Sequence, residues 1–166
     1  TGVGAGYSIN KEIIVGPNKL TGEWGQNPIP GPMDDYEKSV KRHCGRIGAI
    51  EVFLSGPGLE NYYEFISKVK KTSREIVSQY QEGDPVSIEV MNIYFDRIAR
   101  AFSSFVNILD PDVIVCGGGM SEIDDIYKEI PTRIIPYIAS NFFLTPIIKA
   151  THGSSSGVRG AAHLWN

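Results

Sequence analysis

A long helical pattern leads directly into a short apolar segment and three consecutive glycines, and this order limits the possible folds. Asp84 and Pro85 are an N-cap and a first-turn proline, and they predict a helix that runs to about Leu109. Residues 112–116 form an apolar run of the kind found in buried strands, and the glycine turn 117–119 follows it. Helix, strand and glycine turn in this order predict an α/β fold with some parallel strand pairing. The apolar positions of the helix recur at steps of three and four: Ile88, Met91, Phe95, Ile98, Phe102, Phe105 and Leu109.

The remaining elements surround this central pattern. Residues 1–15 predict a β-hairpin, because alternating small and apolar residues flank a turn at Asn10. Residues 20–48 are predicted to be mostly irregular, and a loop of this length is usually functional or held by something such as a metal. Further helices are predicted at 49–54, 59–69, 72–80, 122–127, 131–139 and 157–164, and a last strand at 145–150.

Composition excludes several classes of partner. The chain has 166 residues, with 16 Lys and Arg against 19 Asp and Glu, so its net charge of -3 lacks the basic surface of a nucleic-acid or membrane-surface binder. No apolar run approaches the ~20 residues of a membrane span. Its two cysteines cannot form a disulfide framework and favour a reducing, cytoplasmic compartment. The chain starts at Thr1 inside a glycine-rich strand, with neither Met nor a signal peptide, and we expect a fragment of a longer protein.

Two glycine loops carry the first chemical signal. One is TGVGAG at residues 1–6, and the other is the turn 117–119 after the predicted strand. Glycines let a phosphate or ribose approach backbone amides, which form anion-binding sites. Neither loop matches a Walker motif or a dinucleotide fingerprint, and each is also compatible with plain tight turns. The second loop is the stronger candidate, because α/β folds place ligands at the carboxyl ends of parallel strands.

Carboxylates near glycines carry the second signal. Glu23 lies in the segment GEWGQNP at residues 22–28, and Glu51 lies at the start of the helix predicted after Gly48. A carboxylate accepts hydrogen bonds from adjacent sugar hydroxyls, and an amide both donates and accepts. The alternative is a solvated loop glutamate and a helix-start glutamate that the helix dipole favours. The three histidines have no metal or triad spacing, so no catalytic histidine is predicted.

The ordered motifs resemble those of the ROK family of sugar kinases and repressors. The resemblance covers essentially the whole chain and is greatest to the fructokinase (mannofructokinase) branch, judged by residues 22–28 and the ending at 155–165. The motifs that carry it are TGVGAG (1–6), GEWGQNP (22–28), CGRIGAIE (44–51), LSGPG (54–58), NILDPDVIVCGGGMS (107–121) and SSGVRGAA (155–162).

This resemblance implies the C-terminal lobe of an actin-like ATPase (ribonuclease H-like) fold, an α/β lobe with a mixed sheet and flanking helices. Residues 1–153 would form the lobe, and 154–166 a helix that packs on the N-terminal lobe. The catalytic base, an Asp, is expected upstream of Thr1, so no catalytic residue is assigned in this chain. The implied ligand-binding residues are Thr1, Gly2, Gly4, Gly117, Gly118 and Gly119 for the nucleotide, and Glu23, Gln26 and Glu51 for the sugar.

One departure from the family is large. Many members hold the long loop with a zinc ion bound by one His and three Cys, and at those positions this chain has Gln26, Arg42, Cys44 and Ala49. Only Cys44 remains, whereas a structural zinc needs four N or S donors. We therefore expect no structural zinc. In the family the His at this position also contacts the sugar, so Gln26 would keep a contact with a sugar hydroxyl while altering the specificity for the sugar.

Three functions stay open at this stage. The first is ATP-dependent phosphorylation of a hexose, fructose first, with Mg²⁺ and ATP, by the parent protein, this chain being inactive alone. The second is a sugar-sensing ROK repressor whose DNA-binding segment lies elsewhere. The third is a degenerate lobe that serves in assembly. The resemblance also implies a homodimer with hexose and ATP as partners.

Overall fold

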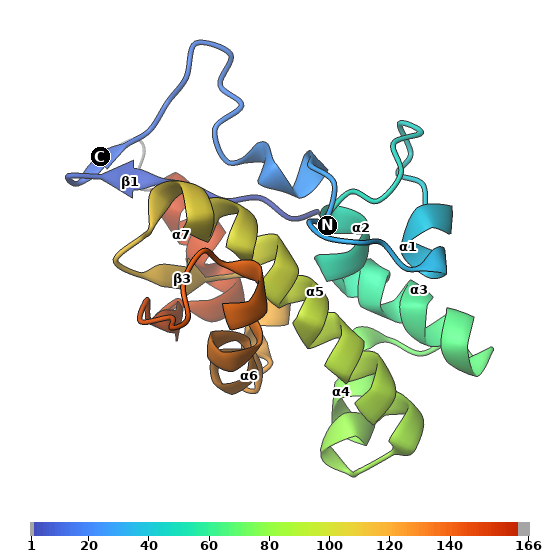
Figure 1. Ribbon diagram of the computed structural model, residues 1–166. Helices are drawn as coiled ribbons and strands as arrows, with labels where there is room; N and C mark the ends of the chain where they lie inside the picture. The colour runs from blue at the N-terminus through green and yellow to red at the C-terminus, as the bar shows by residue number, and fades with distance from the viewer. Residues whose placement is uncertain (1, 163–166) are drawn as a thin grey trace. The chain divides into compact units, whose positions relative to one another are not determined.

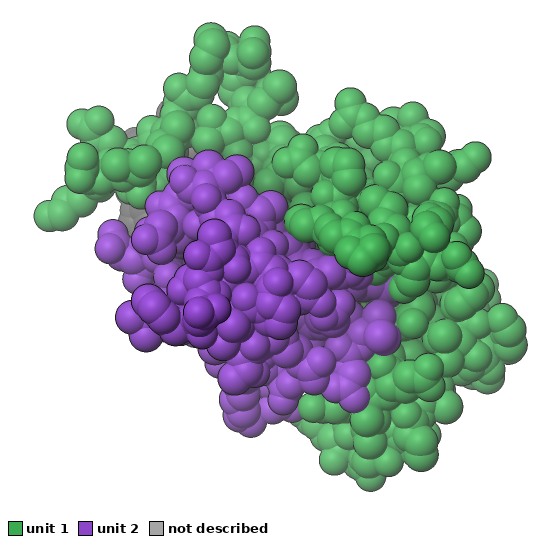
Figure 2. All heavy atoms as spheres, in the orientation of Figure 1, with its two compact units in different colours: residues 1–90 green, residues 91–166 purple. Residues whose placement is uncertain are grey.

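A computed structural model describes residues 2–162 of the chain, with only the backbone at Ser154. The chain forms two compact units, Thr1–Val90 and Met91–Asn166, which are coloured separately in Figure 2. Helix α5 (Pro85–Leu109) begins in the first unit and continues in the second. The division expected at residue 153 stays a prediction.

The first unit is mainly helical. Its two short strands pair antiparallel, with Ser8 opposite Ile13 and Ile9 opposite Glu12, which confirms the predicted hairpin with shorter strands. The elements, several of them labelled in Figure 1, are β1 (Ser8–Ile9), β2 (Glu12–Ile13), the 3₁₀ helix η1 (Glu23–Gln26), α1 (Asp35–Ser39), α2 (Glu51–Leu54), α3 (Gly56–Ser67) and α4 (Ser73–Gln81).

Local caps determine where these helices begin. Ser55 ends α2 and caps α3 by accepting a hydrogen bond from the Gly58 backbone N–H at 3.2 Å. Thr72 forms a capping box with Glu75 at the start of α4. Helix α1 lies in the segment predicted to be mostly irregular. There the Asp34 carboxylate accepts from the Glu37 backbone N–H at 2.7 Å, as part of a capping box.

The second unit contains the parallel pairing that the sequence predicts. Ile114 pairs with Ile147 and Cys116 with Lys149, so the strands of the described residues form one parallel and one antiparallel pair. The last described helix begins at Ser156, and the predicted continuation to residue 164 lies outside the described residues. Besides most of α5, the elements are β3 (Ile114–Cys116), η2 (Gly119–Glu122), α6 (Ile126–Arg133), η3 (Ile135–Tyr137), β4 (Ile147–Lys149), η4 (Gly153–Ser155) and α7 (Ser156–Ala162).

Helix α5 has the predicted bounds and the predicted cap, since Asp84 accepts from the Ser87 backbone N–H at 2.8 Å. The middle of its apolar stripe is buried, with Met91 and Phe95 at most 1% exposed, whereas Ile88 and Leu109 at the ends are more than a third exposed. No helix among residues 2–162 is long and apolar enough to cross a membrane.

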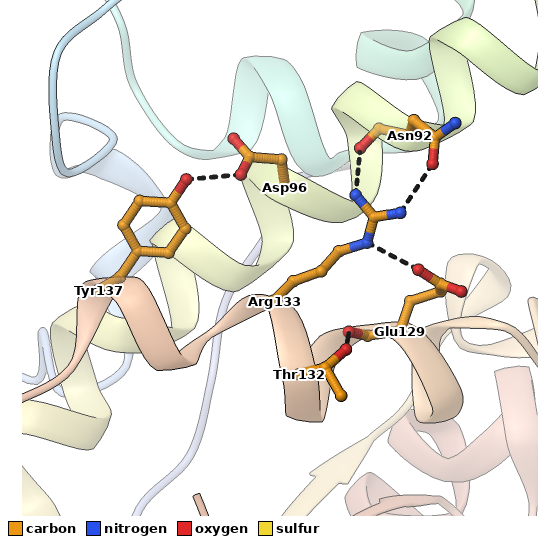
Figure 3. A network of polar contacts seen from close by, with 6 residues as sticks. All are labelled: Asn92, Asp96, Glu129, Thr132, Arg133 and Tyr137. Atoms are coloured by element: carbon orange, nitrogen blue, oxygen red, sulfur yellow. Dashed lines mark hydrogen bonds and ion pairs between the residues drawn. The ribbon is translucent and has the colours of Figure 1, made fainter. Parts of the chain in front are cut away.

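Polar side chains tie the middle of α5 to the segment that follows β3 (Figure 3). Arg133 of α6 donates to the Asn92 side-chain oxygen at 2.7 Å and to the Glu129 carboxylate at 2.7 Å. The Tyr137 hydroxyl donates to the Asp96 carboxylate at 2.6 Å. These contacts fix α6 and η3 on α5, and thereby position the parallel strand pair of the second unit, because α6 also contacts β4.

Candidate functional site

An antiparallel bridge between Pro28 and Ala49 joins the two loops that carry the predicted sugar-binding residues. The Ile50 N–H donates to the Asn27 carbonyl at 2.9 Å, and the Ile29 N–H donates to the Gly48 carbonyl at 2.8 Å. The bridge lies immediately after η1 and immediately before α2. Residues far apart in the sequence are therefore held side by side by the backbone.

Helix η1 carries the first pair of predicted residues. The Gln26 amide donates to the Glu23 carboxylate at 2.8 Å, so the two side chains form one polar group, with Glu23 exposed and Gln26 half-buried. Gly22, which precedes the helix, has a positive φ of 94° that favours glycine. The start of the chain packs against this helix, since the Ala5 N–H donates to the Gly22 carbonyl at 2.8 Å.

Glu51 is the first residue of α2, and its carboxylate lies between the Arg42 side chain and the backbone of Gly2. The Arg42 Nε donates to its Oε1 atom, and the side chains of Arg42 and Glu51 are only 15% and 16% exposed. On the other side, a Cβ added to Gly2 would lie 2.6 Å from Glu51 Oε2. The structure thus brings Gly2 and the Glu51 carboxylate together, and a side chain at position 2 would displace this carboxylate.

Arg42 is the residue that sequence reasoning missed, since it was considered only as the replacement of a zinc ligand. Its Nη1 also donates to the Cys44 sulfur at 3.4 Å. Two hydrogen bonds lower the pKa of the Cys44 thiol. The larger effect comes from the backbone of Arg46, and the smaller from the Arg42 guanidinium. No local spacing signals this role, because Arg42 and Glu51 are nine positions apart and meet only through the loop.

The donors of this loop do not fit a zinc ion. A positively charged guanidinium contacts the one retained cysteine, and Gln26 bonds to Glu23 instead. Within residues 2–162 no group of three or more His, Cys, Asp or Glu side chains is arranged to hold a metal. The expectation of no structural zinc stays a prediction for metal analysis.

The second glycine turn lies in the second unit, at the carboxyl end of strand β3. Gly118 has φ 91° and ψ 178°, a conformation that glycine alone adopts readily. Its carbonyl accepts from the Ser121 hydroxyl at 2.7 Å, which closes the turn into η2. All three glycines of the turn, 117–119, are exposed, and a Cβ at position 118 or 119 would meet no atom within 4 Å. The backbone here is open to a ligand.

The predicted nucleotide-binding residues of the first loop, residues 1–6, differ in how much space surrounds them. Gly4 has room for a side chain, since an added Cβ would lie 3.7 Å from the Gly22 carbonyl. Gly2 faces the Glu51 carboxylate, and Thr1 lies outside the described residues. Gly2 and Gly4 belong to the first unit and the turn 117–119 to the second.

Together these groups suit a polyhydroxylated ligand in the first unit and an anionic or ribose group at the glycine turn of the second. Carboxylates accept hydrogen bonds from hydroxyls, and the Gln26 amide can donate as well as accept. Exposed glycine amides favour anions.

The chain matches known proteins along nearly its whole length. The model of the ROK family matches residues 1–166. An N-acetyl-D-glucosamine kinase of Vibrio atlanticus (strain LGP32) is 36% identical over 99% of this chain and 56% of its own length. The chain therefore spans little more than half of this curated relative.

Solved structures show the same fold. A ROK hexokinase from Thermus thermophilus superposes with a TM-score of 0.80 at 23% identity, over 98% of this chain and 53% of the other. A ROK family glucokinase from Streptomyces griseus, in complex with glucose and AMPPNP, gives a TM-score of 0.85 at 19% identity, over 99% and 57%. The expected α/β kinase fold of the actin-like ATPase type is confirmed. The fructokinase branch is not supported, because the curated relative is an N-acetylglucosamine kinase.

Proposed function

The chain belongs to the ROK family, and from this we propose that the protein containing it is an ATP-dependent sugar kinase. The observation that carries the proposal is the bridge between Pro28 and Ala49, which holds the η1 loop against the start of α2. This places the Glu23–Gln26 pair and Glu51 on adjoining segments, as a site for several sugar hydroxyls requires.

The reaction is a phosphoryl transfer. A sugar hydroxyl oxygen attacks the γ-phosphorus of ATP, a new O–P bond forms, the bond to the β,γ-bridging oxygen breaks, and ADP leaves with that electron pair. A general base takes the hydroxyl proton, and Mg²⁺ neutralises charge on the phosphates. In our proposal, Glu23, Gln26 and Glu51 orient the sugar, and the backbone of residues 117–119 contacts the nucleotide. The base lies in a part of the protein beyond these residues.

N-acetyl-D-glucosamine is the first sugar to test, because the curated relative at 36% identity is named for it. Fructose, which the sequence motifs predict, and glucose are the alternative substrates to compare with it. The same relative favours a kinase over a repressor or a degenerate lobe. The expected homodimer stays a prediction.

The test is an ADP-release assay on the intact protein that contains this chain, with Mg²⁺, ATP and each of the three sugars. The variants are Glu51→Gln and Glu23→Gln, and the control is Glu12→Gln on the exposed strand β2. Losing a hydrogen bond to a charged group should raise the sugar KM roughly tenfold or more in the first two variants and leave it unchanged in the control. The 166-residue chain alone should show no activity.

Two outcomes would contradict the proposal. Sugar binding without any ATP consumption would favour the repressor. Unchanged sugar KM values in both site variants would remove Glu23 and Glu51 from the sugar site.

A further inference from the structure

We propose that Arg42 is a positioning residue that fixes the orientation of the Glu51 carboxylate for sugar binding. This inference rests on the proposed function, since it assigns Glu51 to the sugar site. Arg42 itself need not touch the sugar, because its contacts go to the carboxylate and to Cys44.

The Arg42 guanidinium is held at two of its edges. Nε donates to Glu51 Oε1 and Nη1 donates to Cys44 Sγ, so neighbouring donors of one planar group have different partners. A planar group held at two edges cannot rotate about its long axis without losing one contact. The guanidinium of Arg42 therefore has a fixed plane as well as a fixed position. Because it donates to the Glu51 carboxylate, it also fixes the orientation of that carboxylate.

The Glu51 carboxylate is mostly covered by the protein. The side chains of Arg42 and Glu51 are 15% and 16% exposed, so water covers little of the pair. The backbone of Gly2 lies near Oε2, since an added Cβ would come within 2.6 Å of this atom. Without Arg42, a mostly covered carboxylate would lose its charged partner and would turn towards other donors or water.

Backbone hydrogen bonds hold the turn that carries Arg42. Lys41 and Ile47 form an antiparallel bridge, and the Arg42 N–H donates to the Arg46 carbonyl at 2.8 Å. The Gly45 N–H donates back to the Arg42 carbonyl at 2.8 Å. The chain's own backbone hydrogen bonds close this small turn, and by restricting the arginine they reduce the ordering that sugar binding would require.

Lysine cannot replace this arrangement in full. An ammonium is a point donor on a flexible stem, and it has no second donor fixed in the same plane. Arg42→Lys should therefore keep charge compensation for Glu51 and lose the fixed orientation.

The experiment is a double-mutant cycle in the intact protein, with Arg42→Gln, Glu51→Gln and the double variant, each assayed for sugar KM, ATP KM and kcat. If Arg42 acts through Glu51, Arg42→Gln raises the sugar KM by about tenfold and leaves the ATP KM unchanged. In the Glu51→Gln background it adds no further rise. Arg42→Lys should give an intermediate sugar KM.

Arg46→Gln is the matched control, because it removes the same charge from the same turn while its backbone contacts remain. An equal rise in sugar KM in Arg46→Gln, or additive effects of Arg42→Gln and Glu51→Gln, would overturn the proposal. If Arg42→Gln does not fold, Arg42→Lys takes its place in the cycle. Additive effects of Arg42→Lys and Glu51→Gln on the sugar KM would likewise overturn the proposal.

The two proposals fail differently. No effect of Glu51→Gln on the sugar KM removes Glu51 from the sugar site and ends both. A large effect of Glu51→Gln with none of Arg42→Gln ends only the positioning role.

Discussion

The main-chain carbonyl of Val3 lies where a side chain on Gly25 would have to begin. The carbonyl of Ala5 stands in the same relation to Gly22, and the Ala5 N–H bonds to the Gly22 carbonyl at 2.8 Å. The first segment of the chain therefore lies directly on the backbone of η1, with no side chain between them. The glycines of residues 22–25 are required by this approach, in addition to any contact with a ligand.

Gly25→Ala should destabilise the first unit. The added Cβ would overlap the Val3 carbonyl, and relief requires a backbone shift that costs about 1–3 kcal/mol of unfolding free energy. Gly6→Ala is the control, because nothing lies within 4 Å of its added Cβ and its φ is not positive. Denaturant titration measures both variants, and equal stability of the two would contradict the close approach.

Gly118→Ala should destabilise the second unit through backbone strain alone. No atom would contact the new methyl group, but φ 91° with ψ 178° costs a non-glycine residue about 1–3 kcal/mol. Gly119→Ala has equal space and no positive φ, so its unfolding free energy should stay near that of the parent. Thermal unfolding compares the pair. A Gly118→Ala variant as stable as Gly119→Ala would show that the turn relaxes freely.

The two cysteines should react with iodoacetamide at different pH. The backbone of Arg46 and the guanidinium of Arg42 lower the pKa of the exposed Cys44 thiol, so its reactive thiolate forms at lower pH than in a free cysteine. Burial raises the pKa of Cys116 to about 11, which delays its reaction to strongly alkaline pH. Mass spectrometry of alkylation across pH 6–10 (about the range of protein thiols) should show Cys44 first.

Arg42→Gln gives this prediction its internal control. Removing the guanidinium should move the half-maximal alkylation of Cys44 to higher pH and leave Cys116 unaffected. If Cys44 of the unmutated protein were alkylated with the same pH profile as free cysteine, the contact with Arg42 would be refuted.

Metal removal should leave the first unit intact. The loop around Cys44 is held by Arg42, Glu51 and its own backbone bonds, so a chelator has no structural ion to extract. Purified protein should contain no stoichiometric zinc, and an excess of EDTA should leave the Tm unchanged. One zinc per chain, with a Tm that falls on chelation, would show that the loop binds metal through other donors.

Much of the fold follows from local signals in the sequence. The bounds of α5 follow from Asp84 and Pro85 at its start and from Asp110-Pro111 at its end. The parallel strand pair follows from a short apolar run before glycines. These signals depend on neighbours a few residues apart, which a sequence displays directly.

Helix α1 and the role of Arg42 did not follow in this way. Helix α1 has only five residues, too few for an apolar period, and its capping box lies in a stretch that looks polar throughout. Arg42 reaches Glu51 because bridges at Lys41 and Pro28 fold the loop back, and such long-range pairing has no local signature. The ROK motifs predicted a sugar-binding role for Glu51, which stays a prediction, and they gave no indication that Arg42 is its partner.

The bridge between Pro28 and Ala49 also bears on how such a site diverges during evolution. It closes residues 29–48 into a loop whose two ends are fixed next to each other, so a change in loop length need not separate η1 from α2. Lengthening a closed loop costs little, about 0.6 kcal/mol per doubling. Selection can therefore exchange one kind of cross-link in the loop for another, and change the partner of Glu51, without rebuilding the scaffold that presents it.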